Sequence, residues 1–233
     1  MTTAPVTLIT GASRGIGRHL SEHYLAKGHR VVGCSRGESD LAHDAYIHRS
    51  LDVRDEDAVR GLFAEVRREL GGLDHLVNNA GIASMNHSLL TPVSSVEKIL
   101  ATNTTATFHF AREAAKIMKR RRFGRIVNFT SVAVRLNLEG EAAYIASKAA
   151  VEALTQVMAR ELAEFGITVN ALGPTPVDTD LIRGVPKEKI EALLRRQAIP
   201  RYGTLDDVAH AVDFFLDPKS DFITGQVLFL GGV

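Results

Sequence analysis

Features that would point to several other classes of protein are scarce or missing in this sequence. Its 233 residues include one cysteine, Cys34, so no internal disulfide can form, and a reducing compartment is compatible with the chain. The formal net charge is only +1, which argues against a polyanion-binding protein. No apolar run reaches membrane-spanning length, and the N-terminus lacks the hydrophobic region of a signal peptide. These absences predict a cytoplasmic protein that binds neither nucleic acid nor membranes.

The chain also lacks a linker rich in proline or serine, an internal repeat and a low-complexity stretch. Hydrophobic residues make up 45% and charged residues 24%, which is typical of a globular protein with a substantial core. We therefore predict a single domain over residues 1–233. The nine histidines are scattered and no Cys/His cluster has metal-ligand spacing, so no catalytic metal is predicted.

Short apolar segments alternate with helical patterns along the chain. The expected strands cover residues 6–10, 30–35, 46–51, 75–78, 125–130, 167–172 and 227–230. The expected helices cover residues 16–27, 55–70, 95–121 (one helix or two in tandem), 142–164 and 205–216. This alternation indicates an α/β fold with a doubly wound parallel sheet of about seven strands and helices on both faces. Residues 37–45 are too few for a full crossover helix, so a turn or a single helical turn is expected there.

A glycine-rich turn, Gly-Ala-Ser-Arg-Gly-Ile-Gly at residues 11–17, follows the first predicted strand and opens the first predicted helix. Gly11, Gly15 and Gly17 allow the backbone to approach a pyrophosphate, and the helix N-terminus supplies free N–H groups and the positive end of a dipole. The turn therefore predicts a dinucleotide site.

The end of the second predicted strand distinguishes between coenzymes. It reads Ser35-Arg36, with no carboxylate where an NAD site normally has Asp or Glu. Arg14, inside the glycine turn, adds a second guanidinium. Two such groups can flank a 2′-phosphate, so the sequence predicts NADPH/NADP.

Tyr144 and Lys148 are four residues apart in the predicted helix 142–164, so their side chains share one helix face. An ammonium beside a phenol is expected to lower the phenol pKa from about 10 toward the working range of a proton donor. Ser131 lies thirteen residues before Tyr144, just after a predicted strand. For carbonyl reduction, Tyr144 can supply the proton, Ser131 can orient the carbonyl oxygen, and Lys148 can assist Tyr144.

These motifs together resemble the short-chain dehydrogenase/reductase family, from about residue 5 to the C-terminus. Over its whole length the chain is most similar to the 3-oxoacyl-acyl-carrier-protein reductase branch. The resemblance implies a Rossmann-like fold. It also implies that Asn103 completes the catalytic set by anchoring a water that joins Lys148 to solvent. The cofactor-binding residues that it implies are Gly11, Ser13, Arg14, Gly15, Ile16, Gly17, Ser35, Arg36, Asp52, Val53, Asn79, Ala80, Gly81, Tyr144, Lys148, Pro174, Val177 and Thr179.

One residue departs from the family pattern. Thr175 stands after Pro174, where the family usually has glycine. Threonine does not readily adopt a positive φ. We therefore expect the backbone at the nicotinamide end to depart from the family's path.

The leading functional interpretation is an NADPH-dependent reduction of a ketone to a secondary alcohol, with a 3-oxoacyl thioester as the expected substrate and an acyl carrier protein as its partner. Residues 132–143 and a helical lid at about 176–200 should form the mouth of the site. Basic side chains near the mouth would dock an acidic carrier protein; the candidates are Arg122, Arg183, Arg195, Arg196 and Arg201. Phe165, however, stands where carrier-protein reductases often have a second basic residue.

Two alternatives remain open. The substrate could be a free small ketone or alcohol, selected by Arg135 and Glu139 in the mouth, or these two side chains could only pair with each other. From a different class, the chain could be a non-catalytic NADP-binding sensor, although a sensor does not need all four catalytic residues. The basic run at residues 119–122 is interpreted as a solvated helix end and not as a nucleic-acid patch. Apolar faces on residues 102–121 and 142–164 predict a homotetramer, or else a dimer.

Overall fold

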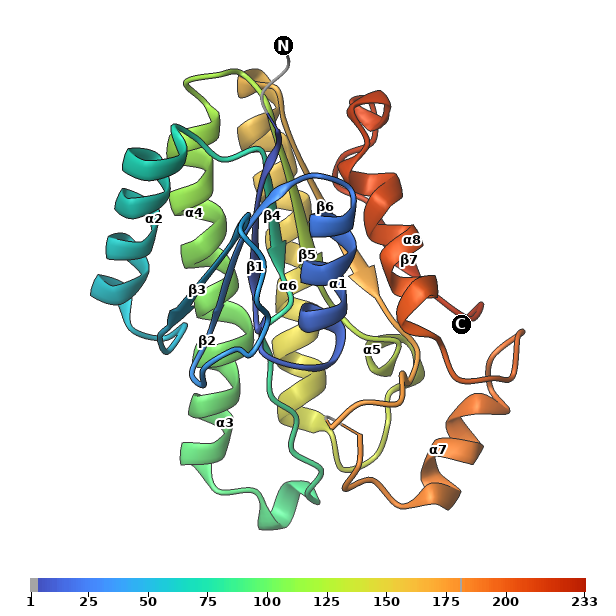
Figure 1. Cartoon of the computed structure of the whole chain (residues 1–233). Coiled ribbons are helices and arrows are strands. Elements are labelled where there is room, and N and C mark those ends of the chain that lie inside the picture. Colours follow the sequence, from blue (N-terminus) through green and yellow to red (C-terminus); the bar gives the residue numbers. More distant parts are fainter. Residues whose placement is uncertain (1–3, 181) are drawn as a thin grey trace.

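A parallel sheet of seven strands forms the centre of the computed structural model, which describes residues 4–180 and 182–233 (Figure 1). The strand order is β3-β2-β1-β4-β5-β6-β7, and all pairs are parallel. The strands are β1 (Val6–Thr10), β2 (Arg30–Ser35), β3 (Tyr46–Ser50), β4 (His75–Asn78), β5 (Gly124–Phe129), β6 (Ile167–Gly173) and β7 (Val227–Phe229). The predicted doubly wound α/β sheet is confirmed.

The helices occupy the places that the sequence pattern indicated, with one addition near the mouth at residues 133–136, and residues 187–194 form a helix within the region expected to be a helical lid. They are α1 (Gly15–Ala26), α2 (Glu56–Leu70), α3 (Val93–Leu100), α4 (Ala106–Met118), α5 (Ala133–Leu136), α6 (Ala142–Leu162), α7 (Lys187–Leu194) and α8 (Leu205–Leu216). Short 3-10 turns lie at Ser88–Leu90, Ala163–Phe165 and Pro218–Ser220. No helix joins β2 to β3, as expected from the short connection at 36–45. In the described residues, no helix is long and apolar enough to cross a membrane.

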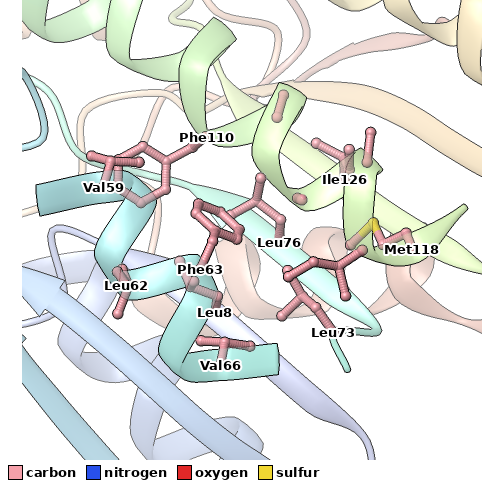
Figure 2. Packing of buried hydrophobic residues seen from close by; sticks show 14 of the residues in the cluster. Leu8, Val59, Leu62, Phe63, Val66, Leu73, Leu76, Phe110, Met118 and Ile126 are labelled. Atoms are coloured by element: carbon pink, nitrogen blue, oxygen red, sulfur yellow. The ribbon is translucent and has the colours of Figure 1, made fainter. Parts of the chain in front are cut away.

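Helices cover both faces of the sheet (Figure 1). On one face α2, α4 and α6 enclose an apolar cluster in which Phe63 of α2 and Phe110 of α4 pack edge to face, with ring centres 5.6 Å apart (Figure 2). On the other face α1 and α8 cover a second cluster that includes Leu20 and Val208. Burying a side chain of this size contributes about 1.5–3 kcal/mol, so each face fixes its helices firmly on the sheet.

A buried chain of amides ties the carboxyl ends of the central strands to α6. Asn78 of β4 donates to Asn128 of β5 (2.9 Å), and Asn128 donates to Thr155 of α6 (2.9 Å). Hydrogen bonds between polar groups in a low-dielectric interior are strong and directional. The network therefore fixes the position of α6, and with it Tyr144 and Lys148, relative to the strand ends.

The lid region, residues 176–200, contains α7, which packs against α5 through a small apolar cluster of Val132, Leu136, Ile190, Leu193 and Leu194. The end of this region is joined to the last residues of the chain. The amides of Ala198 and Ile199 donate to the carbonyls of Gly232 and Gly231, at 3.0 Å each. Leu181 lies outside the described residues, as do residues 1–3.

Candidate active site

The glycine turn lies where the sheet order changes direction, between β1 and β4, which is the usual ligand position in such sheets. Gly11 and Gly15 have φ of +69° and +56°, a conformation that favours glycine. A Cβ on Gly17 would lie 2.2 Å from the carbonyl oxygen of Gly11, so only glycine lets α1 pack this closely on the turn. No side chain caps α1, and its first N–H groups are available to an anion.

The loop after β4 is fastened to this turn. Asn79 Nδ2 donates to the carbonyl of Thr10 (2.9 Å), and the Ala80 amide donates to Thr10 Oγ1 (2.9 Å). These bonds set the distance between the glycine turn and the loop that carries Gly81. Both loops line one cavity.

That cavity measures about 640 Å³, which is the size of a ligand pocket. Of the predicted cofactor residues, those that line it are Gly11, Ser13, Arg14, Gly15, Ile16, Ser35, Arg36, Asp52, Val53, Asn79, Ala80, Gly81 and Thr179. Gly17, Pro174, Val177, Tyr144 and Lys148 are not among its lining residues. The cavity walls also include Arg54, Lys98, Thr102 and Asp180, which the sequence analysis missed.

Ion pairs organise the charged groups of the cavity. Asp52 accepts hydrogen bonds from Nε, Nη2 and the backbone amide of Arg54, and the side-chain pairing is the main reason that the pKa of Asp52 falls to about 2. Arg14 pairs with Asp180 at 3.2 Å and so is held toward the loop after β6. Among the described residues, Arg36 makes no ion pair and stands exposed at the end of β2. Arg36 is therefore the more available of the two predicted phosphate-binding guanidinium groups.

Ser131, Tyr144 and Lys148 come together at the carboxyl end of β5, as the sequence predicted. The Ser131 hydroxyl is close enough to hydrogen-bond the Tyr144 phenol and lower its pKa. Lys148 Nζ lies 5.9 Å from the centre of the Tyr144 ring and donates to the carbonyl of Phe129 at 2.7 Å. Only 8% of Tyr144 and 5% of Lys148 is exposed, so both groups act in a low-dielectric setting.

The expected direction of the Tyr144 pKa shift is wrong for the structure as described. Burial raises the pKa of Tyr144 to about 12, and the Ser131 hydroxyl offsets only part of this. Burial also lowers the pKa of Lys148 to about 8. The sequence argument counted the ammonium and omitted desolvation, which disfavours both charged forms and dominates here.

Asn103 lies in a π-helical turn, Ala101–Thr105, between α3 and α4. Its side chain is fully buried, accepts from the Ile82 amide (2.9 Å) and donates to Ser147 Oγ (3.0 Å). Such turns within helices are frequent at functional sites. Asn103 thus joins the loop after β4 to α6 at Ser147, the residue that precedes Lys148.

Thr175 is accommodated without left-handed backbone, because the non-glycine residues with positive φ in the described parts are only Arg122 and Asn137. Its hydroxyl donates to Gln197 Oε1 (2.7 Å) at the end of the lid region. A Cβ on Gly203 would lie 2.8 Å from the Thr175 methyl group, so a glycine there makes room for the threonine. The departure from the family pattern is compensated by local contacts.

Of the basic residues expected to dock a carrier protein, Arg122 lies away from the mouth and three others already have partners. Arg122 precedes the amino end of β5, whereas Ser131 follows its carboxyl end; at about 3.3 Å per residue these ends lie about 20 Å apart. Arg122 therefore does not flank the mouth of its own chain. Arg135 pairs with Glu152 and not with Glu139. Arg183 and Arg201 pair with acids, and Arg196 donates to a backbone carbonyl.

The chain is similar over nearly its whole length to known proteins. The family model described as Enoyl-(Acyl carrier protein) reductase matches residues 11–232. The 3-oxoacyl-[acyl-carrier-protein] reductase of Vibrio cholerae is 34% identical, over 97% of this chain and 96% of the relative. The reductase of the same name from Escherichia coli is 32% identical over the same shares.

The solved structures agree on the fold. The ligand-free aldohexose dehydrogenase of Thermoplasma acidophilum aligns with a TM-score of 0.90 and 31% identity, over 98% of this chain and 93% of that one. A putative gluconate dehydrogenase from Agrobacterium tumefaciens aligns with a TM-score of 0.90 and 29% identity, over 98% and 94%.

Proposed function

The chain belongs to the short-chain dehydrogenase/reductase family, and on that premise we propose that it reduces a 3-oxoacyl thioester to the corresponding alcohol with NADPH. Family membership makes it an oxidoreductase of CH–OH and C=O groups that uses a nicotinamide coenzyme. The observation that carries the proposed chemistry is the convergence of Ser131, Tyr144 and Lys148 beside the glycine-walled cavity.

The residues of the cavity fit a dinucleotide. Glycines form the approach to α1, whose N-terminus offers unpaired N–H groups to a pyrophosphate. A Cβ on Gly81 would lie 3.4 Å from Lys148 Nζ, so a ligand passing Gly81 comes within reach of the ammonium. Lys148 would hold the ribose hydroxyls and Asp52 the adenine amino group. The bound coenzyme would supply hydride.

Tyr144 would donate the proton that the carbonyl oxygen needs as the carbon gains hydride. Its raised pKa keeps the phenol protonated through neutral pH, so it enters the reaction as an acid. Ser131 would hydrogen-bond the same oxygen and fix its position. Asn103 would support this set by holding Ser147 and the loop at Ile82. The burial of Tyr144 and Lys148 excludes bulk water from the transfer.

The proposed preference for NADPH rests on two features: Arg36 is exposed and makes no ion pair among the described residues, and the sequence has no acid at the end of β2. Arg36→Asp places a carboxylate where the 2′-phosphate would lie. We expect the ratio of kcat/KM for NADPH over NADH to fall by tenfold or more and to invert. Arg14→Gln is the matched variant; because Arg14 pairs with Asp180, it should change the ratio less. Equal kcat/KM with both coenzymes in the parent protein would refute the preference.

The thioester substrate is supported by the names of the curated relatives, which match nearly the whole chain. A free polar ketone or sugar is the second candidate, favoured by the two dehydrogenase structures and by the distance of Arg122 from the mouth. The deciding experiment measures NADPH oxidation with acetoacetyl thioesters, small ketones and diketones. Activity confined to the free ketones would reject the thioester and leave a general ketoreductase.

We also propose a homotetramer in the cytoplasm. Two separate apolar faces are exposed: Phe108 and Val157 on α4 and α6, at 40% and 54%, and Phe214 and Leu228 on α8 and β7, at 48% and 38%. The second face includes a hollow of about 540 Å³. Tetramers with two-fold symmetry use two different self-complementary faces.

Light scattering tests this proposal. Phe108→Glu and Phe214→Glu should each convert the tetramer into a dimer. A parent protein that shows only a 25.3 kDa species would contradict the proposed assembly.

A further inference from the structure

Glu152 of α6 is a largely enclosed carboxylate to which the catalytic scheme above gives no role. It lies one turn after Lys148 on the same face of the helix, and only 12% of its side chain is exposed. Its Oε1 accepts a hydrogen bond from the Thr130 hydroxyl at 2.9 Å, and its Oε2 accepts one from Nη2 of Arg135 at 3.4 Å. These two partners stand on either side of Ser131 in the sequence.

The first contact fixes the residue before Ser131. Thr130 Oγ1 has a single proton to donate, and its shorter contact goes to Glu152, since the carbonyl of Lys148 lies at 3.2 Å. The Thr130 amide donates to the carbonyl of Leu172 in β6 at 2.9 Å. Thr130 is buried, so its backbone and its side chain are both held in the interior. Glu152 therefore helps to set the direction in which the chain enters Ser131.

The second contact fixes the helical turn after Ser131. Arg135 belongs to α5, which has only four residues, and a helix this short takes its position from tertiary contacts. The guanidinium of Arg135 also lies over the Phe229 ring of β7, with Cζ 4.6 Å from the ring centre. At the start of α5, the Ala133 amide donates to Ser131 Oγ at 3.2 Å. Because Oγ accepts this bond, its own proton stays available for the carbonyl oxygen of a substrate.

Glu152 is the acid that joins these two flanks. Among the described residues, Arg135 has no ion pair other than the one with Glu152. Without the carboxylate, Arg135 would be held only by the Phe229 ring, and the Thr130 hydroxyl would turn to a backbone carbonyl of α6. Both flanks of the catalytic serine would then be less firmly held.

We propose that Glu152 is a positioning residue for the reduction. By holding Thr130 and Arg135, it keeps the Ser131 hydroxyl directed at the place where the carbonyl oxygen must lie. The inference rests on the proposed function. In the reaction the carbonyl carbon gains hydride, and the carbonyl oxygen takes the Tyr144 proton while it is hydrogen-bonded to Ser131. Glu152 takes no part in these bond changes and exchanges no proton, so it acts only through the position of Ser131.

A double-mutant cycle with Ser131 tests this role, using the carbonyl substrate that the parent protein reduces fastest. Glu152→Gln keeps an oxygen for Thr130 and loses the ion pair with Arg135, whereas Glu152→Ala loses both contacts. We expect kcat to fall by about threefold in Glu152→Gln and by about tenfold or more in Glu152→Ala, while the Kd for NADPH stays within about twofold of the parent. In a Ser131→Ala background the same substitutions should change kcat by less than about twofold.

The matched control is Glu161→Gln. Glu161 is exposed on the same helix and makes no ion pair among the described residues, so its substitution should leave kcat unchanged. Equal falls in kcat with and without Ser131 would overturn the inference, because Glu152 would then only stabilise the fold. A loss of NADPH affinity as large as the loss of kcat would overturn it as well.

Amide hydrogen exchange gives a second measurement that needs no substrate. The amides of residues 131–136 should exchange about tenfold faster in Glu152→Ala than in Glu161→Gln, and equal rates would overturn the inference. This result decides if Ser131→Ala has no measurable turnover. If Glu152→Ala does not fold, Glu152→Gln and Thr130→Val take its place, with the same direction of change expected in both. A parent protein that reduces no thioester would reject the proposed function, and the exchange experiment would still test the role of Glu152.

Discussion

The coenzyme side of the cavity is built from the ends of β1, β2, β3 and β4, whereas the substrate side is built from α5, the loop before α6 and α7. On the first side the decisive contacts lie within the glycine turn, such as Gly17 against Gly11, and between the ends of neighbouring strands, such as Asn79 to Thr10. On the second side they join segments outside the sheet, such as Thr175 to Gln197 and α7 to α5. The coenzyme side is thus set by the strand ends of the sheet, and the substrate side by packing that can change without disturbing the sheet.

The largest expected effect lies at the junction of the two sides. Tyr144→Phe keeps the ring but removes the proton donor, so turnover should fall by about 10²-fold or more. Coenzyme affinity should change little, and a fluorescence titration with NADPH checks this. Near-normal turnover in the variant would remove Tyr144 from the mechanism.

The second prediction tests the coenzyme side alone. Gly17→Ala forces a Cβ to within 2.2 Å of a backbone oxygen, so the turn must shift and NADPH affinity should fall by about tenfold or more. Gly184→Ala in the lid region is the matched control, because no atom lies within 4 Å of its Cβ. If both variants bound NADPH equally well, the proposed contrast between the two sides of the cavity would be wrong, because the glycine turn would then tolerate an added methyl group as the lid region does.

The third prediction concerns the cost of placing an ammonium in the site. The pKa of Lys148 is lowered to about 8 by burial, from an ordinary value near 10.5. The unfolded chain therefore binds more protons than the folded one between these values, and stability rises with pH across this window. Lys148→Met should abolish activity yet stabilise the coenzyme-free protein by on the order of 1–2 kcal/mol at pH 7. Thermal melts should show that the difference in stability between Lys148→Met and the parent protein is smaller at pH 10 than at pH 7. A variant less stable than the parent at pH 7 would contradict this prediction.

The smallest effect is expected on the substrate side. Thr175→Val removes the hydroxyl that binds Gln197 and leaves that buried amide without a partner, at a cost of about 1 kcal/mol. Denaturant unfolding measures this loss. The KM for NADPH should stay within about twofold of the parent. A larger rise in KM would show that the contact between Thr175 and Gln197 also affects coenzyme binding.

The contrast between the two sides explains what the sequence could predict. The strands at 6–10, 30–35 and 75–78 and the helix at 205–216 match the structure residue for residue, because turns and apolar periods mark them locally. The glycine turn and the residues after β4 were recognisable for the same reason. The helix α5 was not identified, and α7 was expected only as an unplaced helix within the lid region at 176–200, since the apolar residues of these two helices face each other and not the sheet.

Other misses depend on tertiary contacts that a sequence does not display. The bidentate contact from Nε and Nη2 of Arg54 to the two carboxylate oxygens of Asp52 could have been suspected from their spacing of two residues, but its geometry depends on how β3 ends. The direction of the Tyr144 pKa shift depends on burial by segments far away in the chain. Arg122 was placed near the mouth because strand direction was not considered; β5 carries it to the other end of the sheet.

The bonds between residues 198–199 and 231–232 bear on how the protein should be handled. An affinity tag or a reporter fused after Val233 would disturb Gly231 and Gly232, and through their hydrogen bonds the end of the lid region at residues 198–199. A tag before β1 would enter at the amino end of that strand, opposite the glycine turn at its carboxyl end. Kinetic constants measured with a C-terminal tag would therefore describe a protein whose lid region is less firmly held. An N-terminal tag is the better choice for comparing substrates.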